Sequence, residues 1–117
     1  MDAHTMLRRL VRGHNPATGY HWHALVNAVG EVAGSPGEES ERVLRDLLAF
    51  EGEVPLSDVS PLPHAMSPVD SLKSHAVQAL GSWDSAKHRD VITRVAERAS
   101  SDLLGAIARA HLPEARG

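Results

Sequence analysis

VNAVGEV at residues 26–32 returns 51 positions later as VQALGSW at residues 77–83. Each copy is followed by a short polar turn and then by a second segment whose apolar residues recur at helical spacing. The repeated unit is therefore a helical hairpin, and such hairpins stack because one hairpin cannot bury its apolar face alone. The repeat predicts an all-α fold of about six helices, arranged as stacked antiparallel hairpins in a short α-solenoid.

The helix boundaries are predicted from residues that favour or prevent helix ends. Ser35-Pro36-Gly37-Glu38 and Ser67-Pro68-Val69-Asp70 both read as N-terminal capping boxes, in which the serine accepts a hydrogen bond from a backbone N–H three residues on. Pro55, Pro61 and Pro63 prevent a helix between the boxes, which predicts a long proline-rich loop between helices three and four. The predicted single domain, residues 1–117, consists of a first helix ending at Gly13, a hairpin at 20–50, the loop at 51–67, a hairpin at 68–99 and a terminal helix at 101–112.

The composition predicts a core made mostly of aliphatic side chains. Apolar residues make up 42% of the 117 positions, whereas aromatic residues make up only 3%. Leu, Val, Ile and Ala must therefore fill the space between the helices. Trp22 and Trp83 both lie on apolar helical stripes, so we expect them to pack in the core. A tryptophan exposed in a groove would instead be typical of a binding hot spot.

The second copy of the repeat and its surroundings resemble a known class of protein. The residues that carry the likeness are 76–81 (AVQALG), Asp84, Val91, Ile92, Val95 and 104–110 (LGAIARA). They close one helix, occupy the following turn, mark the second helix and open the next unit. In these features the chain resembles HEAT-type and armadillo-like helical repeats, over residues 20–50 and 69–111. The first hairpin lacks the turn aspartate, and a plain six-helix bundle is the alternative architecture.

The resemblance also implies a function. Repeats of this kind generally act as binding scaffolds, in which the second helix of each hairpin lines a concave face. The chain would then be a non-catalytic protein-binding scaffold. Its concave face would carry Arg42, Arg45 and Ala49 from the third helix, and Asp90, Arg94 and Glu97 from the fifth. The alternative interpretation is that the charged residues among them are ordinary solvated charges.

Acidic residues are concentrated in one part of the chain. Residues 38–58 contain seven acids against two arginines, a net charge of −5, whereas the whole chain carries −3. This distribution favours another protein with a basic surface as the partner, because opposite charges speed association. One concrete version is an inhibitor or immunity-type protein that covers a nuclease or a similar toxin. Its predicted contacts are Glu51, Glu53, Asp58 and His64.

The sequence lacks the common signatures of catalysis. It has no cysteine, no Gly-x-Ser-x-Gly elbow, no phosphate-binding Gly-Lys-Ser/Thr loop and no His-Glu-x-x-His pattern. His21 and His23 are two residues apart, so on a helix they point about 200° away from each other. We therefore predict no enzyme activity, no cofactor and no metal site. The rival hypothesis is a small enzyme or ligand-binding protein that uses the histidine-rich second helix and the 51–67 loop.

The remaining predictions concern location and other partners. The N-terminal residues show no basic-then-apolar signal region, and no apolar run approaches the roughly 18 to 20 residues that span a bilayer. We expect a cytoplasmic protein that does not bind membranes. Arg8, Arg9 and Arg12 form only a small positive patch, which argues against nucleic acid. Self-association through terminal hairpins is a further prediction, since end units of a repeat leave apolar faces uncovered.

Overall fold

The computed structural model describes residues 2–57, 67–99 and 101–112. This part of the chain is all-helical, which confirms the predicted class. Its only extended pairing is an isolated bridge between Tyr20 and Leu56. The six helices are α1 (Ala3–Arg12), α2 (Trp22–Ala33), α3 (Glu38–Ala49), α4 (Pro68–Asp84), α5 (Arg89–Arg98) and α6 (Asp102–Ala110).

The capping residues explain some of these boundaries and correct one prediction. The Ser67 hydroxyl accepts a hydrogen bond from the Asp70 N–H at 3.3 Å, as the predicted capping box requires, and Ser101 caps α6 in the same way. The box at residues 35–38 is wrong. α3 begins at Glu38 after Gly37, and its N-terminus has no side-chain cap. Glu38 is thus the first residue of the helix, which is too early to complete a box.

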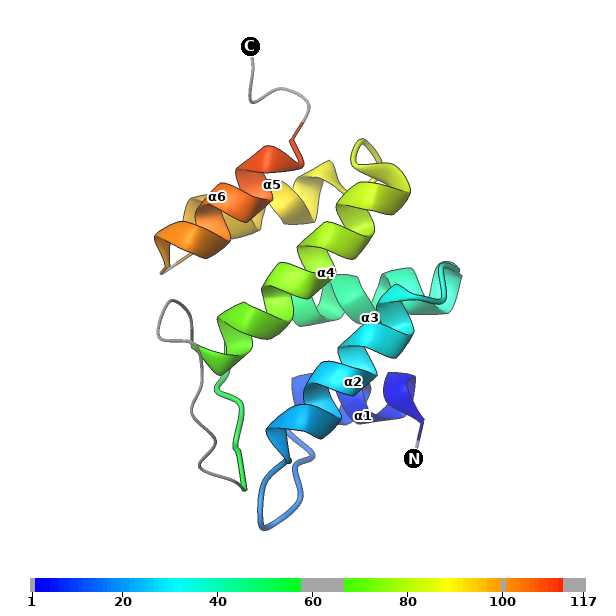
Figure 1. Ribbon diagram of the computed structural model, residues 1–117, viewed down its shortest axis with the longest axis vertical. Helices are drawn as coiled ribbons and strands as arrows, with labels where there is room; N and C mark the ends of the chain where they lie inside the picture. The colour runs from blue at the N-terminus through cyan, green and yellow to red at the C-terminus, as the bar shows by residue number, and fades with distance from the viewer. Residues whose placement is uncertain (1, 58–66, 100, 113–117) are drawn as a thin grey trace.

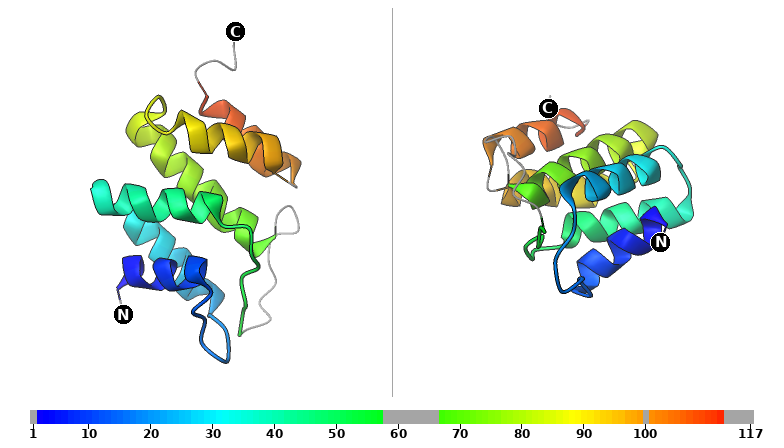
Figure 2. Two further views of the ribbon diagram at one scale, coloured as in Figure 1. Left: turned by 180° about the vertical axis from the view of Figure 1, so that it is seen from behind. Right: turned by 60° about the horizontal axis from the view of Figure 1, so that its bottom comes forward.

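The helices form two layers of three (Figures 1 and 2). In one layer α3 lies between α1 and α5, and in the other α4 lies between α2 and α6. Within each layer the three helices run in roughly the same direction, as the views from the front and from behind show. The layers are joined chiefly by α1 packing on α2, α3 on α4 and α5 on α6. We call them the α1–α3–α5 layer and the α2–α4–α6 layer.

Each helix of the predicted hairpins packs mainly on helices outside its own hairpin. α2 makes its larger interfaces with α1 and α4 and only a small one with α3, while α5 packs most extensively on α6. The turn between α2 and α3 carries the chain from one layer to the other, so those helices are neighbours in sequence more than in space. The repeated segments 26–32 and 77–83 lie in α2 and α4, which contact each other directly.

The core between the layers is aliphatic, as the composition predicts. Nine leucine and isoleucine side chains are almost completely buried: Leu7, Leu10, Leu25, Leu44, Leu47, Leu72, Leu80, Ile92 and Leu104. Burying a Leu or Ile side chain contributes about 1.5–3 kcal/mol. Trp22 is also buried, as expected, whereas Trp83 is only half-buried and packs against the edge of the core. No described helix is long and apolar enough to span a bilayer.

The first part of the predicted 51–67 loop is attached to the segment before α2. The Tyr20 N–H donates to the Pro55 carbonyl at 2.9 Å, and the Ser57 N–H donates to the Tyr20 carbonyl at 2.8 Å. Gly19 has a φ of +84°, and a Cβ there would come within 2.9 Å of the Leu56 backbone. Glycine is needed at this position because of both constraints. Residues 58–66, with Asp58 and His64, lie outside the described residues.

Candidate functional site

The two layers differ sharply in charge. Helices α1, α3 and α5 carry three, six and five Asp, Glu, Lys or Arg residues, fourteen among their 32 positions. Helices α2, α4 and α6 carry one, three and two, six among 38. Because both layers contribute to the same core, this difference lies on their outer faces. The protein therefore offers two possible binding faces, one rich in charged side chains and one with few of them.

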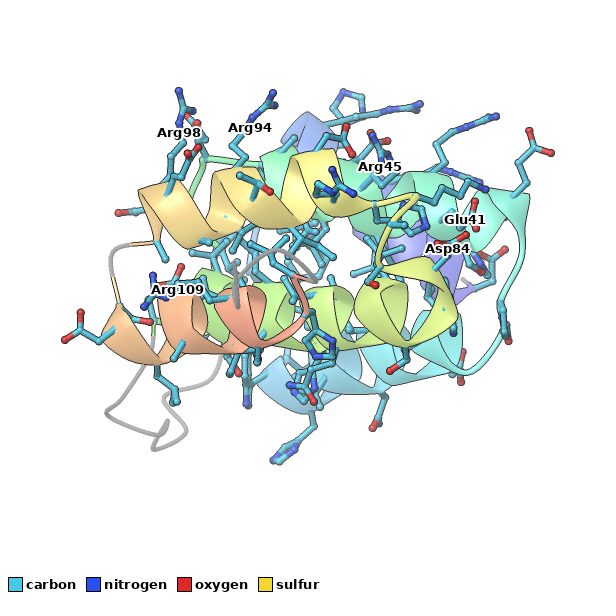
Figure 3. The ribbon with its side chains drawn as sticks, turned by 90° about the horizontal axis from the view of Figure 1, so that it is seen from above. Glu41, Arg45, Asp84, Arg94, Arg98 and Arg109 are labelled. Atoms are coloured by element: carbon cyan, nitrogen blue, oxygen red, sulfur yellow. The ribbon has the colours of Figure 1, made fainter. Side chains whose placement is uncertain are left out.

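In the α1–α3–α5 layer, charged side chains of α3 and α5 bind each other. Arg45 donates to both carboxylate oxygens of Asp90, at 3.1 and 2.7 Å. One turn earlier on α3, Glu41 accepts from the Lys87 ammonium at 2.8 Å. Figure 3 shows Glu41 and Arg45 on α3 along the edge that faces α5. These contacts join α3 to α5 and to Lys87 in the turn before α5, across more than 40 residues of sequence.

The same contacts change the pKa values of the acids. The hydrogen bonds from Arg45 lower the pKa of Asp90, and the hydrogen bond from Lys87 lowers the pKa of Glu41. The bonds to Asp90 in turn raise the pKa of Arg45. All four side chains are therefore charged at neutral pH, and each is matched by a partner from the other side of the α3–α5 contact.

His88 lies beneath these ion pairs and is completely buried. Its Nδ1 accepts a hydrogen bond from Arg45 at 3.2 Å, which assigns the ring proton to Nε2. Nε2 is 3.6 Å from a Glu41 oxygen and has no hydrogen-bond partner among the described residues. The imidazole ring therefore lies between the Arg45 guanidinium and the Glu41 carboxylate. His88 immediately precedes α5, so these contacts support the packing of α5 on α3.

The predicted binding residues fall into three groups. Arg45 and Asp90 meet directly, while Arg42 pairs with Glu38 and Glu51 pairs with Arg98. Arg94 and Glu53 are exposed, and Arg94 lines a pocket that Glu51 also lines. Asp58 and His64 lie beyond the described ranges. Of the six predicted binding residues that the structure describes, four are thus paired within the chain itself.

A contact between α1 and α3 has the connectivity of a hydrolase triad. His4 Nε2 is 2.8 Å from the Ser40 hydroxyl, and His4 Nδ1 is 3.9 Å from a Glu39 oxygen. Glu39 also accepts from Arg8 at 3.0 Å. A nucleophile must be reached by its substrate, yet Ser40 is only 3% exposed in the helix interface. We interpret this group as a structural link between α1 and α3.

The histidines before and in α2 do not converge. His21 Nδ1 is 3.5 Å from the Ser57 hydroxyl, and His23 is exposed. In residues 2–57, 67–99 and 101–112, no three His, Asp or Glu side chains are placed to hold a metal ion.

The α2–α4–α6 layer carries a shallow groove between α2 and α4, here called the α2–α4 groove. Its lining residues are Val26, Gly30, Ala33, His75, Gln78, Ala79, Ser82 and Trp83. None of them is an Asp, Glu, Lys or Arg. Gly30 is exposed, and a Cβ built on it would meet no atom within 4 Å. Most of the groove is therefore formed by the two repeat segments, and Trp83 lines it instead of lying in the core as its sequence position predicts.

A second hollow lies at the other end of α4 and is here called the Lys73 pocket. It has a volume of about 270 Å³ and lies among the last turn of α3, residues 50–52, the first turns of α4 and the last turns of α5. Its charged lining is supplied by Lys73, Arg94, Arg98, Glu51 and Asp70.

Comparisons of the chain with protein families, with curated proteins and with solved structures found no match.

Proposed function

We propose that the chain is a non-catalytic protein-binding module and that its α2–α4 groove is the binding surface. The architecture we propose for it is a short α-solenoid of HEAT-like type, with α1–α2, α3–α4 and α5–α6 as successive pairs. Two layers of three helices support this arrangement, as does the direct contact between the two repeat segments. Stacked repeats of this kind offer a continuous surface to a partner.

The observation that carries the proposal is a half-buried tryptophan in a groove without formal charges. The centres of protein interfaces are depleted in charged residues and enriched in tryptophan, which often supplies much of the binding energy. Trp83 lines the groove together with the small residues Gly30 and Ala79, and a Cβ at Gly30 would meet open space. On the opposite layer several charged side chains, such as Arg45 and Asp90, are bound to each other and are therefore less available to a partner.

The groove fits an apolar helix of another protein. Two neighbouring helices that run in the same direction leave a furrow between them, and an amphipathic helix can place its apolar side there. A charged side chain over the furrow would lose water without gaining a counter-ion from Val26, Ala33 or Trp83. The occupant is therefore a helix whose contact side is aliphatic, with uncharged polar residues opposite His75 and Gln78.

The version with a basic partner depends on free carboxylates. Two of the acids predicted to contact such a partner, Glu51 and Glu53, lie in the described part of the chain. Glu51 is bound to Arg98 at 2.6 Å, which leaves Glu53 as the exposed acid of these two without an ion pair. Exposed ion pairs are screened by water and leave little field for steering. We therefore place the basic-partner version second to the apolar groove.

The proposal is tested by measuring partner binding to variants in which the lining of the α2–α4 groove is changed. Wild-type protein is used to capture its partner from the native host, and the purified partner is then titrated against the Gly30→Leu and Trp83→Ala variants. Leu at position 30 has open space and occupies the groove, so we expect a loss of affinity of at least about tenfold, and a similar loss for Trp83→Ala.

The matched control is Arg42→Leu, which puts the same side chain on the exposed surface of the opposite layer. It should bind like wild type. The proposal is wrong if no protein is captured, if Gly30→Leu binds as tightly as wild type, or if Arg42→Leu is the variant that loses affinity.

A further inference from the structure

The Lys73 pocket combines an apolar wall with a concentration of cations. Its wall is made by seven apolar side chains: Leu48, Ala49, Phe50, Val69, Val95, Ala99 and Leu104. Arg94 and Arg98 reach it from neighbouring turns of α5, which Figure 3 shows on one edge of the molecule. Lys73 comes from the second turn of α4. A pocket of about 270 Å³ is small, below the usual range for drug-sized ligands.

Two of the three cations have no partner within the described part of the chain. Arg98 is bound to Glu51 at the rim, where both side chains are mostly exposed. The Lys73 ammonium and the Arg94 guanidinium make no hydrogen bond or ion pair with any described residue. Burial lowers the pKa of Lys73, although Asp70 and Glu51 act in the opposite direction. A half-buried ammonium without an acceptor is costly, and an anion in the pocket would remove that cost.

The charge balance of the lining selects the kind of anion. Three cations face the two carboxylates Glu51 and Asp70, so the lining has one positive charge in excess. A singly charged ligand matches this excess, whereas a doubly charged phosphate would be repelled by the two carboxylates. The apolar wall requires that the rest of the ligand be hydrocarbon.

We infer that the Lys73 pocket binds a small monocarboxylate with an apolar body, whose carboxylate is held by Lys73 and Arg94. The apolar body lies against Phe50, Val95 and Leu104. This site is separate from the α2–α4 groove, because the two have no lining residue in common. The inference does not depend on the protein-binding function.

The experiment uses hexanoate as the probe, added to the ¹⁵N-labelled protein and followed by NMR. We expect saturable shifts of the Gly52 and Lys73 amide signals, with a Kd of about 1 mM. Hexanamide has nearly the same shape without the charge and should bind at least about tenfold more weakly. Inorganic phosphate should produce no saturable shift of these signals.

Three variants separate the roles of the side chains. Lys73→Met should weaken hexanoate binding by at least about tenfold, and Arg94→Gln by a smaller factor. Arg42→Gln is the matched control, because Arg42 is an exposed α3 arginine outside this pocket, and it should bind like wild type. If Lys73→Met fails to fold, Lys73→Arg is the substitute, and it should keep the affinity within about threefold.

The inference is overturned by any of four results. The first is that hexanoate gives no saturable signal shift, and the second is that hexanamide binds as tightly as hexanoate. The third is that phosphate binds more tightly than hexanoate, and the fourth is that folded Lys73→Met keeps the wild-type affinity for hexanoate. The second result would leave only an apolar pocket, and the third would assign the site to phosphate. Gly30→Leu should bind hexanoate normally, so failure of the groove proposal would leave this test unaffected.

Discussion

The two layers of this protein share one core but expose opposite chemistry. The α1–α3–α5 layer carries most of the helical charge, and its α3–α5 contact is made by ion pairs such as Arg45–Asp90. The α2–α4–α6 layer has few charges and holds the groove beside Trp83. The lesson is that a large number of charged residues does not by itself mark a binding surface. Charged side chains that bind each other stabilise the fold, whereas the α2–α4–α6 layer, with few charges, is the face we propose for a partner.

The repeat glycines Gly30 and Gly81 show the same contrast within one layer. Both occupy the fifth position of the motif that α2 and α4 share, yet Gly30 has open space, whereas a Cβ at Gly81 would collide with the Nδ1 atom and ring of His111. α6 and the residue that follows it therefore lie directly on α4, whereas no described residue of another helix comes within 4 Å of a Cβ at Gly30 on α2. The first copy of the motif is thus exposed where the second is packed.

The largest expected effect follows from these glycines. Gly81→Ala should lower the free energy of unfolding by about 1–3 kcal/mol, because His111 and the end of α6 must move. Gly30→Ala should raise it by about 0.5–1 kcal/mol, because alanine favours the helix and meets no neighbour. Urea unfolding followed by circular dichroism measures both. If the two variants were equally stable, the packing of His111 on α4 would be wrong.

The next effect concerns the ion pairs of the charged layer. Arg45→Met should lower the free energy of unfolding by about 1–2 kcal/mol, because Asp90 loses two hydrogen bonds and the buried His88 loses its donor. Arg42→Met, on the same helix, should cost less than about 0.5 kcal/mol, since Arg42 makes only an exposed pair with Glu38. Equal losses in the two variants would remove the special role of Arg45.

A smaller effect is expected from pH. The pKa of Asp90 lies below its ordinary value of 3.8 and that of Glu41 below 4.5 in the folded chain. Such acids stabilise the fold above their unfolded pKa, and the stabilisation is lost as pH falls through the folded pKa. The urea midpoint should therefore fall between about pH 5 and about pH 3.

The Asp90→Asn variant should show a flatter fall over the same range, because an amide does not titrate. Gln78→Glu provides a control at an exposed site in the α2–α4–α6 layer, which carries few charges. Its urea midpoint should follow the wild-type curve more closely than that of Asp90→Asn. A wild-type fall that Asp90→Asn does not reduce would mean that the Arg45–Asp90 pair contributes nothing to the pH dependence.

The smallest effect is spectroscopic. Trp83 is half-buried at the groove, whereas Trp22 is buried, so acrylamide should quench the fluorescence of Trp83 preferentially. Trp83→Phe should remove the accessible component and leave only weakly quenched emission. If quenching were unchanged in this variant, Trp83 would not be the exposed tryptophan.

Local signals in the sequence predicted most of the fold. Helix number and class follow from apolar spacing, and the Ser67 cap was predicted correctly because a cap involves only residues three apart. The 35–38 box failed because its serine and glycine are equally compatible with a turn, and Gly37 is the residue that precedes α3. The packing of α2 on α4 in preference to α3 depends on contacts across tens of residues, which apolar spacing does not encode.

The candidate sites were harder to predict for the same reason. Arg45 and Asp90 were assigned to one face, and they do meet. Their mutual pairing was not foreseen, because sequence counts charge without showing which charges meet. Trp83 was expected in the core, since a helical stripe cannot show where its edge lies. The Lys73 pocket combines residues from α3, α4, α5 and α6, and none of these helices carries a motif for it.

Site-directed crosslinking in the native host distinguishes the two faces most directly. A photoreactive benzophenone side chain is placed at Gln78, exposed in the α2–α4 groove, or at Arg42, exposed on the charged layer. Binding through the groove predicts a covalent adduct with one partner protein from position 78 and none from position 42. An adduct from position 42 alone, or no adduct from position 78, would contradict the assignment of the groove as the binding surface.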